Sequence, residues 1–294
     1  MLLLIASVVL PILITVGIGI VWTRLGYKLE SRDLTALIAD VATPCLVIST
    51  FQASRLSFEA FTAVAAAATT AIALFVGAGA LLLWITGLRI RTFLPSIAFP
   101  NAGNLGLPLS LYAFGPEGLG YAIAFFSISS VANYTFGQAI AAGKANWGGL
   151  LRLPLLYAVA IGIALSFWEV ELPAPVAKTL ALIGNLTVPL MLLMLGASLS
   201  RLKVSSFGRA AAVSAFRIGG GALIGILVAT LFDLAGAMKA VLILQSANPV
   251  AVYNYLFAQR WNNEPEEVAG VVVLSTAASI ATIPLLLAWL SLSP

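Results

Sequence analysis

Apolar segments, each about as long as a helix that crosses a bilayer, follow one another along this chain with short loops between them. We count ten, at residues 2–22, 34–52, 60–84, 93–113, 118–141, 149–168, 176–199, 210–232, 238–258 and 267–290. The first lacks a basic leader and is too long for the apolar part of a signal peptide, so we expect it to be retained. The pattern predicts an all-α integral membrane protein with ten transmembrane helices in a single domain, residues 1–294.

The fourth and ninth segments carry polar and helix-breaking residues in their middle. These are Asn101, Gly103, Asn104, Gly106 and Pro108 in the fourth, and Gln245, Ser246, Asn248 and Pro249 in the ninth. Pro108 removes a backbone donor and the glycines permit non-helical dihedrals, so we expect an unwound stretch between two half-helices. Lipid cannot satisfy such a backbone, which survives only inside protein or beside a water-filled cavity. A proline kink would explain one such segment, but a matched pair indicates the binding site of a secondary transporter.

The two halves of the chain resemble each other at offsets of 143 to 145 residues. The matching pairs are Pro11 with Pro154, Pro44 with Pro189, and Asn104 with Asn248. A unit with an odd number of spans has to be inverted in its second copy. We therefore expect two inverted five-helix repeats, residues 1–145 and 146–294, with broken helices 4 and 9 crossing at the membrane midplane.

Composition excludes most other classes of protein. The chain is 61% hydrophobic and 9% charged, whereas soluble domains carry about 25% charged residues, so the bilayer has to be its solvent. The single cysteine, Cys45, excludes an internal disulfide, and the lack of histidine removes His-based zinc sites, His general bases and Ser-His catalysis. We expect no enzyme activity, no cofactor and no nucleic-acid partner, since the basic residues are scattered singly. The lack of histidine and of a paired intramembrane acidic motif also argues against an intramembrane enzyme, and a channel or a sensor would not explain the repeat.

The basic residues also predict an orientation. Of the 15 Lys and Arg residues, 11 lie in loops that follow odd-numbered spans and three in loops that follow even-numbered spans. Cytoplasmic loops carry the excess of Lys and Arg. We therefore expect both termini on the outer, periplasmic or extracellular side of the membrane.

Asp40 and Asn185 occupy matching places, four residues before Pro44 and Pro189. A carboxylate at membrane depth is costly and is a functional hypothesis by default. Asp40 is thus a candidate for taking up a proton or a cation, with Asn185 facing it across the midplane. The alternatives place Asp40 at the cytoplasmic interface or pair it with a basic loop residue.

Arg217 lies one to two turns inside the eighth span. It could bind a carboxylate substrate or pair with Asp40, but we favour a third account in which its side chain extends to the lipid headgroups. In the fifth span, Asn133 and Gln138 are large and polar enough to face a cavity. The Ser and Thr residues of spans 5 and 10 are better explained as hydrogen bonds that join helices.

Four stretches together resemble the auxin efflux carrier family of transporters. They are PCLVIST at 44–50, FPNAGNLGLPLSLYAFG at 99–115, LTVPLMLLMLGASLS at 186–200 and QSANPVAVYNYLFAQRW at 245–261. The resemblance implies ten helices in inverted repeats, with helices 4 and 9 crossing around the substrate, in a wider fold similar to the bile acid sodium symporters. It assigns the crossover positions to Asn104, Pro108, Asn248 and Pro249. The chain lacks a long central loop and is nearer the short bacterial type, which implies a bacterial inner membrane.

These observations favour a secondary active transporter that moves a small organic anion by alternating access, with export as the direction by analogy. Protons or the membrane potential are favoured over sodium as the driving force. The alternative is a sodium-coupled importer of the bile acid symporter type, for which Asn101, Asn104, Gln245 and Asn248, together with Ser246, would supply the oxygen ligands. A homodimer stays open as a further partner.

Overall fold

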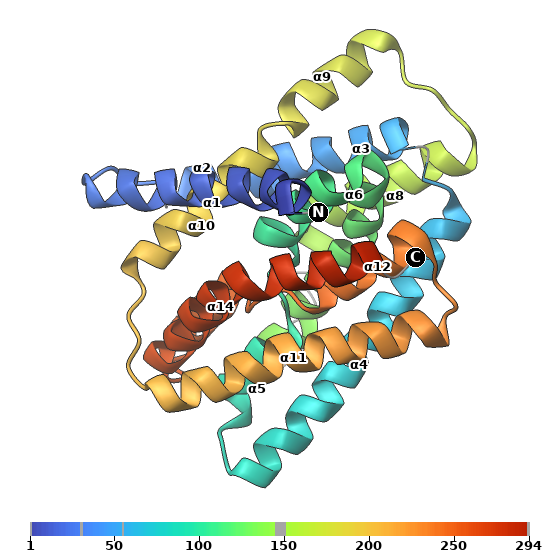
Figure 1. Ribbon diagram of the computed structural model, residues 1–294. Helices are drawn as coiled ribbons and strands as arrows, with labels where there is room; N and C mark the ends of the chain where they lie inside the picture. Colours follow the sequence, from blue (N-terminus) through green and yellow to red (C-terminus); the bar gives the residue numbers. More distant parts are fainter. Residues whose placement is uncertain (1, 30–31, 55, 145–150, 293–294) are drawn as a thin grey trace.

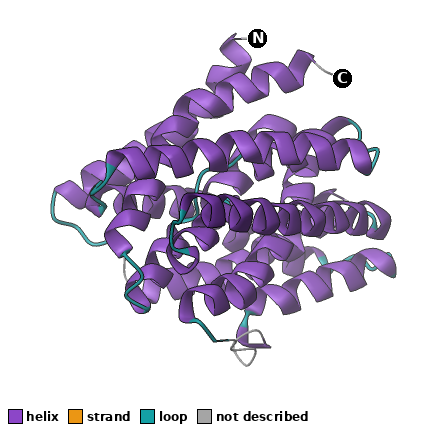
Figure 2. Ribbon diagram, turned by 90° about the horizontal axis from the view of Figure 1, so that it is seen from below, coloured by secondary structure: helices purple, strands orange, loops and turns teal. Residues whose placement is uncertain are grey.

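The computed structural model describes residues 2–29, 32–54, 56–144 and 151–292, and within these ranges it consists of helices and loops without a sheet (Figures 1 and 2). The α-helices are α1 Leu2–Arg24, α2 Arg32–Ala36, α3 Thr43–Ser54, α4 Phe58–Thr86, α5 Ile90–Ala98, α6 Leu107–Ala132, α7 Gln138–Ala142, α8 Pro154–Phe167, α9 Ala174–Gly184, α10 Thr187–Arg201, α11 Phe207–Leu231, α12 Gly236–Ser246, α13 Val252–Arg260 and α14 Pro265–Leu292. Three π-helical turns, η1 Leu37–Ala42, η2 Ala102–Gly106 and η3 Asn133–Gly137, are continuous with the α-helices that follow them.

Six helical segments of the described chain are long and apolar enough to cross a membrane. They are Ala6–Arg24, Asp33–Ser54, Phe58–Thr86, Ala174–Arg201, Phe207–Leu231 and Pro265–Leu290. This confirms an all-α membrane protein. The other four expected spans fall on shorter or interrupted helices. The first residues of the expected span 149–168 and the expected repeat boundary at 145/146 lie outside the described residues.

The interrupted segments explain most of the difference between the ten expected spans and the six long helical segments. α5 ends at Ala98, in the middle of the fourth expected span, and α12 ends at Ser246, in the middle of the ninth. The long helix α6 contains a sharp turn at Gly115, whose φ of 66° and ψ of −161° are non-helical. Such a positive φ is accessible to glycine without a Cβ clash. Residues on the two sides of Gly115 therefore belong to separate expected spans.

The helices pack in two groups. In the first group, α1 packs along α10, and α3 packs against α8 and α9. In the second group, α11 packs against α12, α14 and α4, while α4 and α12 also contact α6. Figure 1 shows α1, α3, α9 and α10 in the upper half of the molecule and α4, α5, α11, α12 and α14 in the lower half. The two groups meet along a boundary that contains the site described below.

The contact between α1 and α10 depends on glycine. A Cβ on Gly19 would lie closer than 3.0 Å to the carbonyl of Leu193, and a Cβ on Gly196 would meet the carbonyl of Val16. Small residues let membrane helices approach until their backbones touch, which replaces the hydrophobic drive that lipid removes. Close backbone packing therefore joins α1 to α10 within the first group.

Replacing Gly19 with Ala should lower the thermal unfolding midpoint of the purified protein in detergent, because its new methyl group meets a backbone that cannot retreat. Overpacking of this kind costs about 1–3 kcal/mol. The matched control is Gly17→Ala on the same helix, where nothing lies within 4 Å of the new Cβ and alanine is the better helix former. Equal midpoints for the two variants would contradict this account of the α1–α10 contact.

Candidate functional site

The two interrupted helices meet at their breaks. Phe99 leaves α5 in an extended conformation, with φ −109° and ψ 111°. The Asn101 N–H donates to the carbonyl of Pro249 over 2.7 Å, and the Ala251 N–H donates to the carbonyl of Phe99 over 3.3 Å. The breaks thus form a short antiparallel pair that satisfies each other's backbone groups inside the protein, as a bilayer environment demands.

The position of the first break differs from expectation. Pro108 lies at the start of α6, just after the π-helical turn η2, and the chain stays helical through it. The chain instead departs from helix at Phe99 to Asn101, and Pro100 faces Val250 across the antiparallel pair. Pro108 was therefore wrong as the residue that interrupts the helix, because the helix continues through it from η2 into α6.

Each break leaves the C-terminus of one half-helix and the N-terminus of the next. Helix N-termini carry unpaired N–H groups and partial positive charge, and C-termini carry unpaired carbonyls and partial negative charge. The first residues of η2, Ala102 to Asn104, and the first residues of α13, Val252 and Tyr253, line the same cavity. The positive ends of the two half-helices therefore converge on one space.

The negative ends converge on Arg217 of α11, whose side chain is 0% exposed. Its Nε donates to the carbonyl of Asn248 over 3.1 Å and its Nη1 to the carbonyl of Ile97 over 2.8 Å, and its Nη2 donates to the carbonyl of Ser246. The ring of Phe75 covers the guanidinium, 4.2 Å from its centre. One buried cation thus satisfies carbonyls from the ends of both α5 and α12.

This geometry corrects the favoured expectation for Arg217. The side chain does not reach toward lipid headgroups, because it is enclosed by protein on all sides. Within the described ranges it forms no ion pair with Asp40, and it is not part of the cavity wall that a substrate would touch. The position of Arg217 near the end of a span in the sequence did not reveal that its side of the helix faces the crossover.

Glycines on the same face of α11 allow this contact. Gly221 and Gly225 follow Arg217 at intervals of four residues, which places all three on one side of the helix. A Cβ on Gly221 would clash with the carbonyl of Ser246, and one on Gly225 would lie 2.9 Å from the Cα of Ile243. The helix can therefore approach the end of α12 closely enough for the guanidinium to reach its carbonyls.

A small amide cluster fills the crossover next to η2. The Asn248 Nδ2 donates to the Gln245 Oε1 over 3.1 Å, and both side chains are 0% exposed. A Cβ on Gly106 would lie closer than 3.0 Å to both amide ends. The Gln245 Nε2, the Asn248 Oδ1 and the Ser246 Oγ have no hydrogen-bond partner. Buried polar groups without partners are rare and point to function or to bound water.

Two residues outside the expected site also hold the crossover together. Asn254 in the first turn of α13 donates through Nδ2 to the carbonyls of Pro95, over 3.1 Å, and Phe99, over 3.3 Å. Ser275 of α14 accepts through Oγ from the Val250 N–H over 3.1 Å. For Ser275, a hydrogen bond that joins elements agrees with the expectation for the polar residues of the tenth span. Asn254 was missed, although it continues the asparagine-rich stretch of the ninth span.

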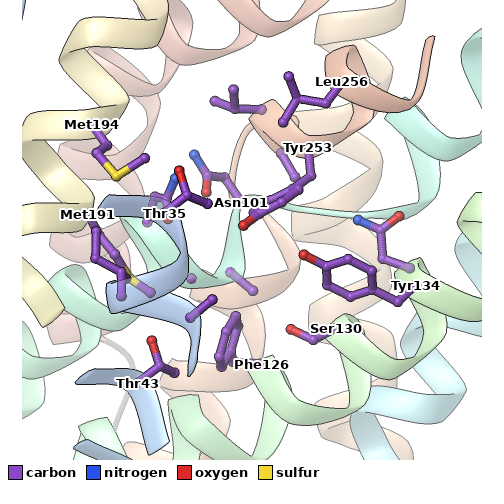
Figure 3. A pocket seen from close by; sticks show the side chains of 18 of the residues that line it. Thr35, Thr43, Asn101, Phe126, Ser130, Tyr134, Met191, Met194, Tyr253 and Leu256 are labelled. Atoms are coloured by element: carbon purple, nitrogen blue, oxygen red, sulfur yellow. The ribbon is translucent and has the colours of Figure 1, made fainter. Parts of the chain in front are cut away.

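A cavity of about 540 Å³ lies between the two helix groups. Figure 3 shows Met191 and Met194 on one side of it, Tyr134 and Tyr253 on the other, and Asn101 near the middle. Of the expected site residues, the wall contains Asp40, Asn101, Asn104 and Asn133. Gly106, Pro108, Gln245, Ser246, Asn248 and Pro249 are buried at the crossover and are not in the wall, and Gln138 also lies outside it. Asn185 is exposed at the end of α9, away from the wall.

All three π-helical turns contribute to this wall. η1 supplies Asp40, η2 supplies Asn104, and η3 supplies Asn133 and Tyr134. A π-turn carries one extra residue per turn, is rare, and is frequently found at functional sites. Sequence reasoning did not foresee these turns, since no residue type marks them.

The cavity is mostly apolar with a few polar groups. The rings of Tyr134 and Tyr253 meet edge to face at 5.7 Å, and neither tyrosine was expected at the site. Among the described residues, Asp40 and Arg201 are the charged residues of the wall. In the described part of the chain, no three His, Cys, Asp or Glu side chains gather as metal ligands. The space suits an organic molecule with a single charged group.

Comparison with known proteins agrees with this geometry. The membrane transport protein family matches residues 139–287, just over half of the chain. The chain is 28% identical over 198 residues to an uncharacterized transporter of Methanocaldococcus jannaschii, with 63% of each protein covered. It is 26% identical over 195 residues to an uncharacterized transporter of Methanothermobacter thermautotrophicus, with 64% of each covered.

A plant protein gives a more specific name. The chain is 26% identical over 134 residues to auxin efflux carrier component 1 of Arabidopsis thaliana, which covers 43% of this chain and 22% of the plant protein. In each of these three comparisons the match spans less than two thirds of the relative's own length. The chain belongs to the membrane transport protein family, the family that includes the auxin efflux carriers.

Proposed function

We propose that this protein is a secondary active transporter, not an enzyme, and that it moves a small organic anion across a bacterial inner membrane by alternating access. The observation that carries the proposal is the convergence of two half-helix N-termini, from η2 and α13, on one cavity between two helix groups. Broken helices that present N-terminal ends to a shared site bind anionic substrate groups in transporters.

The wall chemistry supports an organic anion. Positive half-helix ends and Arg201 favour a carboxylate or a similar group, while Phe126, Met191 and Tyr253 offer apolar contact to its carbon skeleton. A volume of about 540 Å³ is within the range of small-molecule sites. The names of the plant relatives favour export as the direction of transport.

The position of the cavity supports alternating access. Its walls belong to different helix groups, so a movement of one group against the other would change the access to it. Two inverted five-helix repeats with crossing helices 4 and 9 would supply ten spans and two related states. Wall residues Thr35, Pro154, Arg201 and Gln259 adjoin loops rich in Lys and Arg, which supports an entrance on the cytoplasmic side with both termini outside.

The sodium-coupled alternative is less well supported by the crossover. Asn101 and Asn104 line the cavity, whereas Gln245 and Asn248 are buried beneath it, so the four expected ligands do not share one space. The Gln245 Oε1 already accepts from Asn248. We therefore favour protons or the membrane potential as the driving force, with Asp40 as the candidate coupling residue.

The function is tested by reconstituting the purified protein in liposomes and measuring flux of a panel of small organic acids. Imposed pH and sodium gradients should be applied separately. We expect flux of at least one acid, and Asn104→Ala should lower it about tenfold or more, because a misplaced positioning group commonly costs that much. Thr179→Ala, on the exposed surface of α9, is the control. Absence of flux for every acid, or wild-type flux by Asn104→Ala, would count against the proposal.

Gly106→Ala should reduce flux about tenfold or more while lowering the unfolding midpoint only modestly. Its Cβ meets the amide ends of Gln245 and Asn248, which can shift, and not a backbone, so the fold should survive with a displaced amide pair. The control is Gly219→Ala, where no atom lies within 4 Å of the new Cβ. Normal flux by Gly106→Ala would show that the amide pair is not needed for transport.

Asp40→Asn should remove the stimulation of flux by an imposed pH gradient, because an amide cannot carry the proton that a carboxylate can. Flux driven by substrate concentration alone should continue. The control carboxylate is Asp233→Asn, at the exposed end of α11, which should leave the pH response unchanged. An Asp40→Asn variant that still responds to the gradient would exclude this residue as the proton carrier.

A further inference from the structure

Arg217 is the largest fully buried side chain of the described protein, and the proposed transport function does not by itself explain it. Removing a guanidinium from water is costly unless hydrogen bonds and opposite charge compensate. Here the compensation comes from backbone carbonyls and the face of Phe75, with no carboxylate of the described residues in an ion pair with it. The partners of this cation are therefore helix ends.

Those helix ends are of a specific kind. The carbonyls of Ile97 and Ser246 belong to the last turns of α5 and α12, and that of Asn248 lies in the break that follows α12. Such carbonyls have lost the N–H that a continuing helix would supply. In transporters built on broken helices, unwound carbonyls and half-helix C-termini are the ligands of the coupling cation. The guanidinium occupies the position that such a cation would take.

We propose that Arg217 is a resident cation of the crossover: its guanidinium takes the place of a coupling metal cation, and removing it opens a latent site for a small cation. The inference rests on the proposed transport function for its consequence, that the native protein needs no sodium. Arg217 is a positioning residue, because it acts on the substrate only through the backbone of α5 and α12.

The charge arrangement explains why a fixed cation would be useful there. The two C-terminal ends bring partial negative charges together in a region of low dielectric constant, where they repel one another strongly. Arg217 cancels this repulsion permanently, so the two half-helices stay paired whether or not the cavity is occupied. A bound ion would hold them together only while it was present.

The test is thermal unfolding of the purified protein in detergent, at constant ionic strength, with sodium, lithium, potassium or choline as the cation. The wild type should unfold at the same midpoint in all the metal salts and in choline. Arg217→Ala should unfold at a lower midpoint in choline and regain at least about 2 °C in one of the smaller cations, since a ligand that binds only the folded state raises the midpoint.

Matched variants separate this role from a merely structural one. Arg209→Gln removes an exposed arginine of the same helix, which pairs with Glu267 at 2.8 Å, and should show no dependence on the cation. Arg217→Lys keeps the charge but not the planar donors, so its midpoint should also be independent of the cation while its flux falls about tenfold. If Arg217→Ala does not yield folded protein, Arg217→Gln serves in its place with the same outcomes.

Two results would overturn the inference. One is an equal loss of stability by Arg217→Ala in every cation, which would mean that no cation site is exposed. The other is a wild-type midpoint or flux that requires sodium. The unfolding measurement needs no substrate, so a lack of flux for all organic acids would reject the proposed function while leaving this inference tested on its own.

Discussion

Every backbone N–H and C=O of the two interrupted helices has to find a partner inside the protein, because hydrocarbon offers none. The chain meets this demand by letting the breaks satisfy each other, through the hydrogen bonds between Asn101 and Pro249 and between Ala251 and Phe99. Asn254 and Ser275 then take up the neighbouring carbonyl and N–H groups. The two breaks are thus held to each other by hydrogen bonds within the protein, and the surrounding helices keep lipid away from them.

The crossover also separates charge. The positive ends of the half-helices open on the cavity, while the negative ends are covered by one guanidinium on the opposite side. A binding site that relies on backbone dipoles needs few charged side chains, and Asp40 and Arg201 are the charged side chains that the described part of the chain contributes to the cavity wall. This agrees with a chain in which only 9% of residues are charged, and under the proposed function it would leave selection among anions to the shape of an apolar pocket.

The sequence predicted where the helices and their breaks lie better than it predicted which side of each helix faces the site. Asn and Pro in apolar segments located both interruptions, because few physical arrangements tolerate them at membrane depth. Pro108 was misassigned because the chain leaves the helix earlier, where Pro100 pairs with Val250, and the helix continues from η2 through Pro108. Arg217 was misassigned because distance from a span end does not specify the side of the helix; the glycines at intervals of four after it were the available signal. Tyr134 and Tyr253 carried no signal, since aromatic residues are common throughout apolar segments.

The three π-turns have a consequence for how the length of this chain can vary. Each holds one residue more than an α-turn, and one residue rotates the rest of a helix by about 100°. Deleting a residue at η1, η2 or η3 would restore regular winding while turning Asp40, Asn104 or Asn133 toward a different neighbour. Surface loops can gain or lose residues freely. At these turns, in contrast, a single residue determines which side chains of the helix face the cavity and which face away from it.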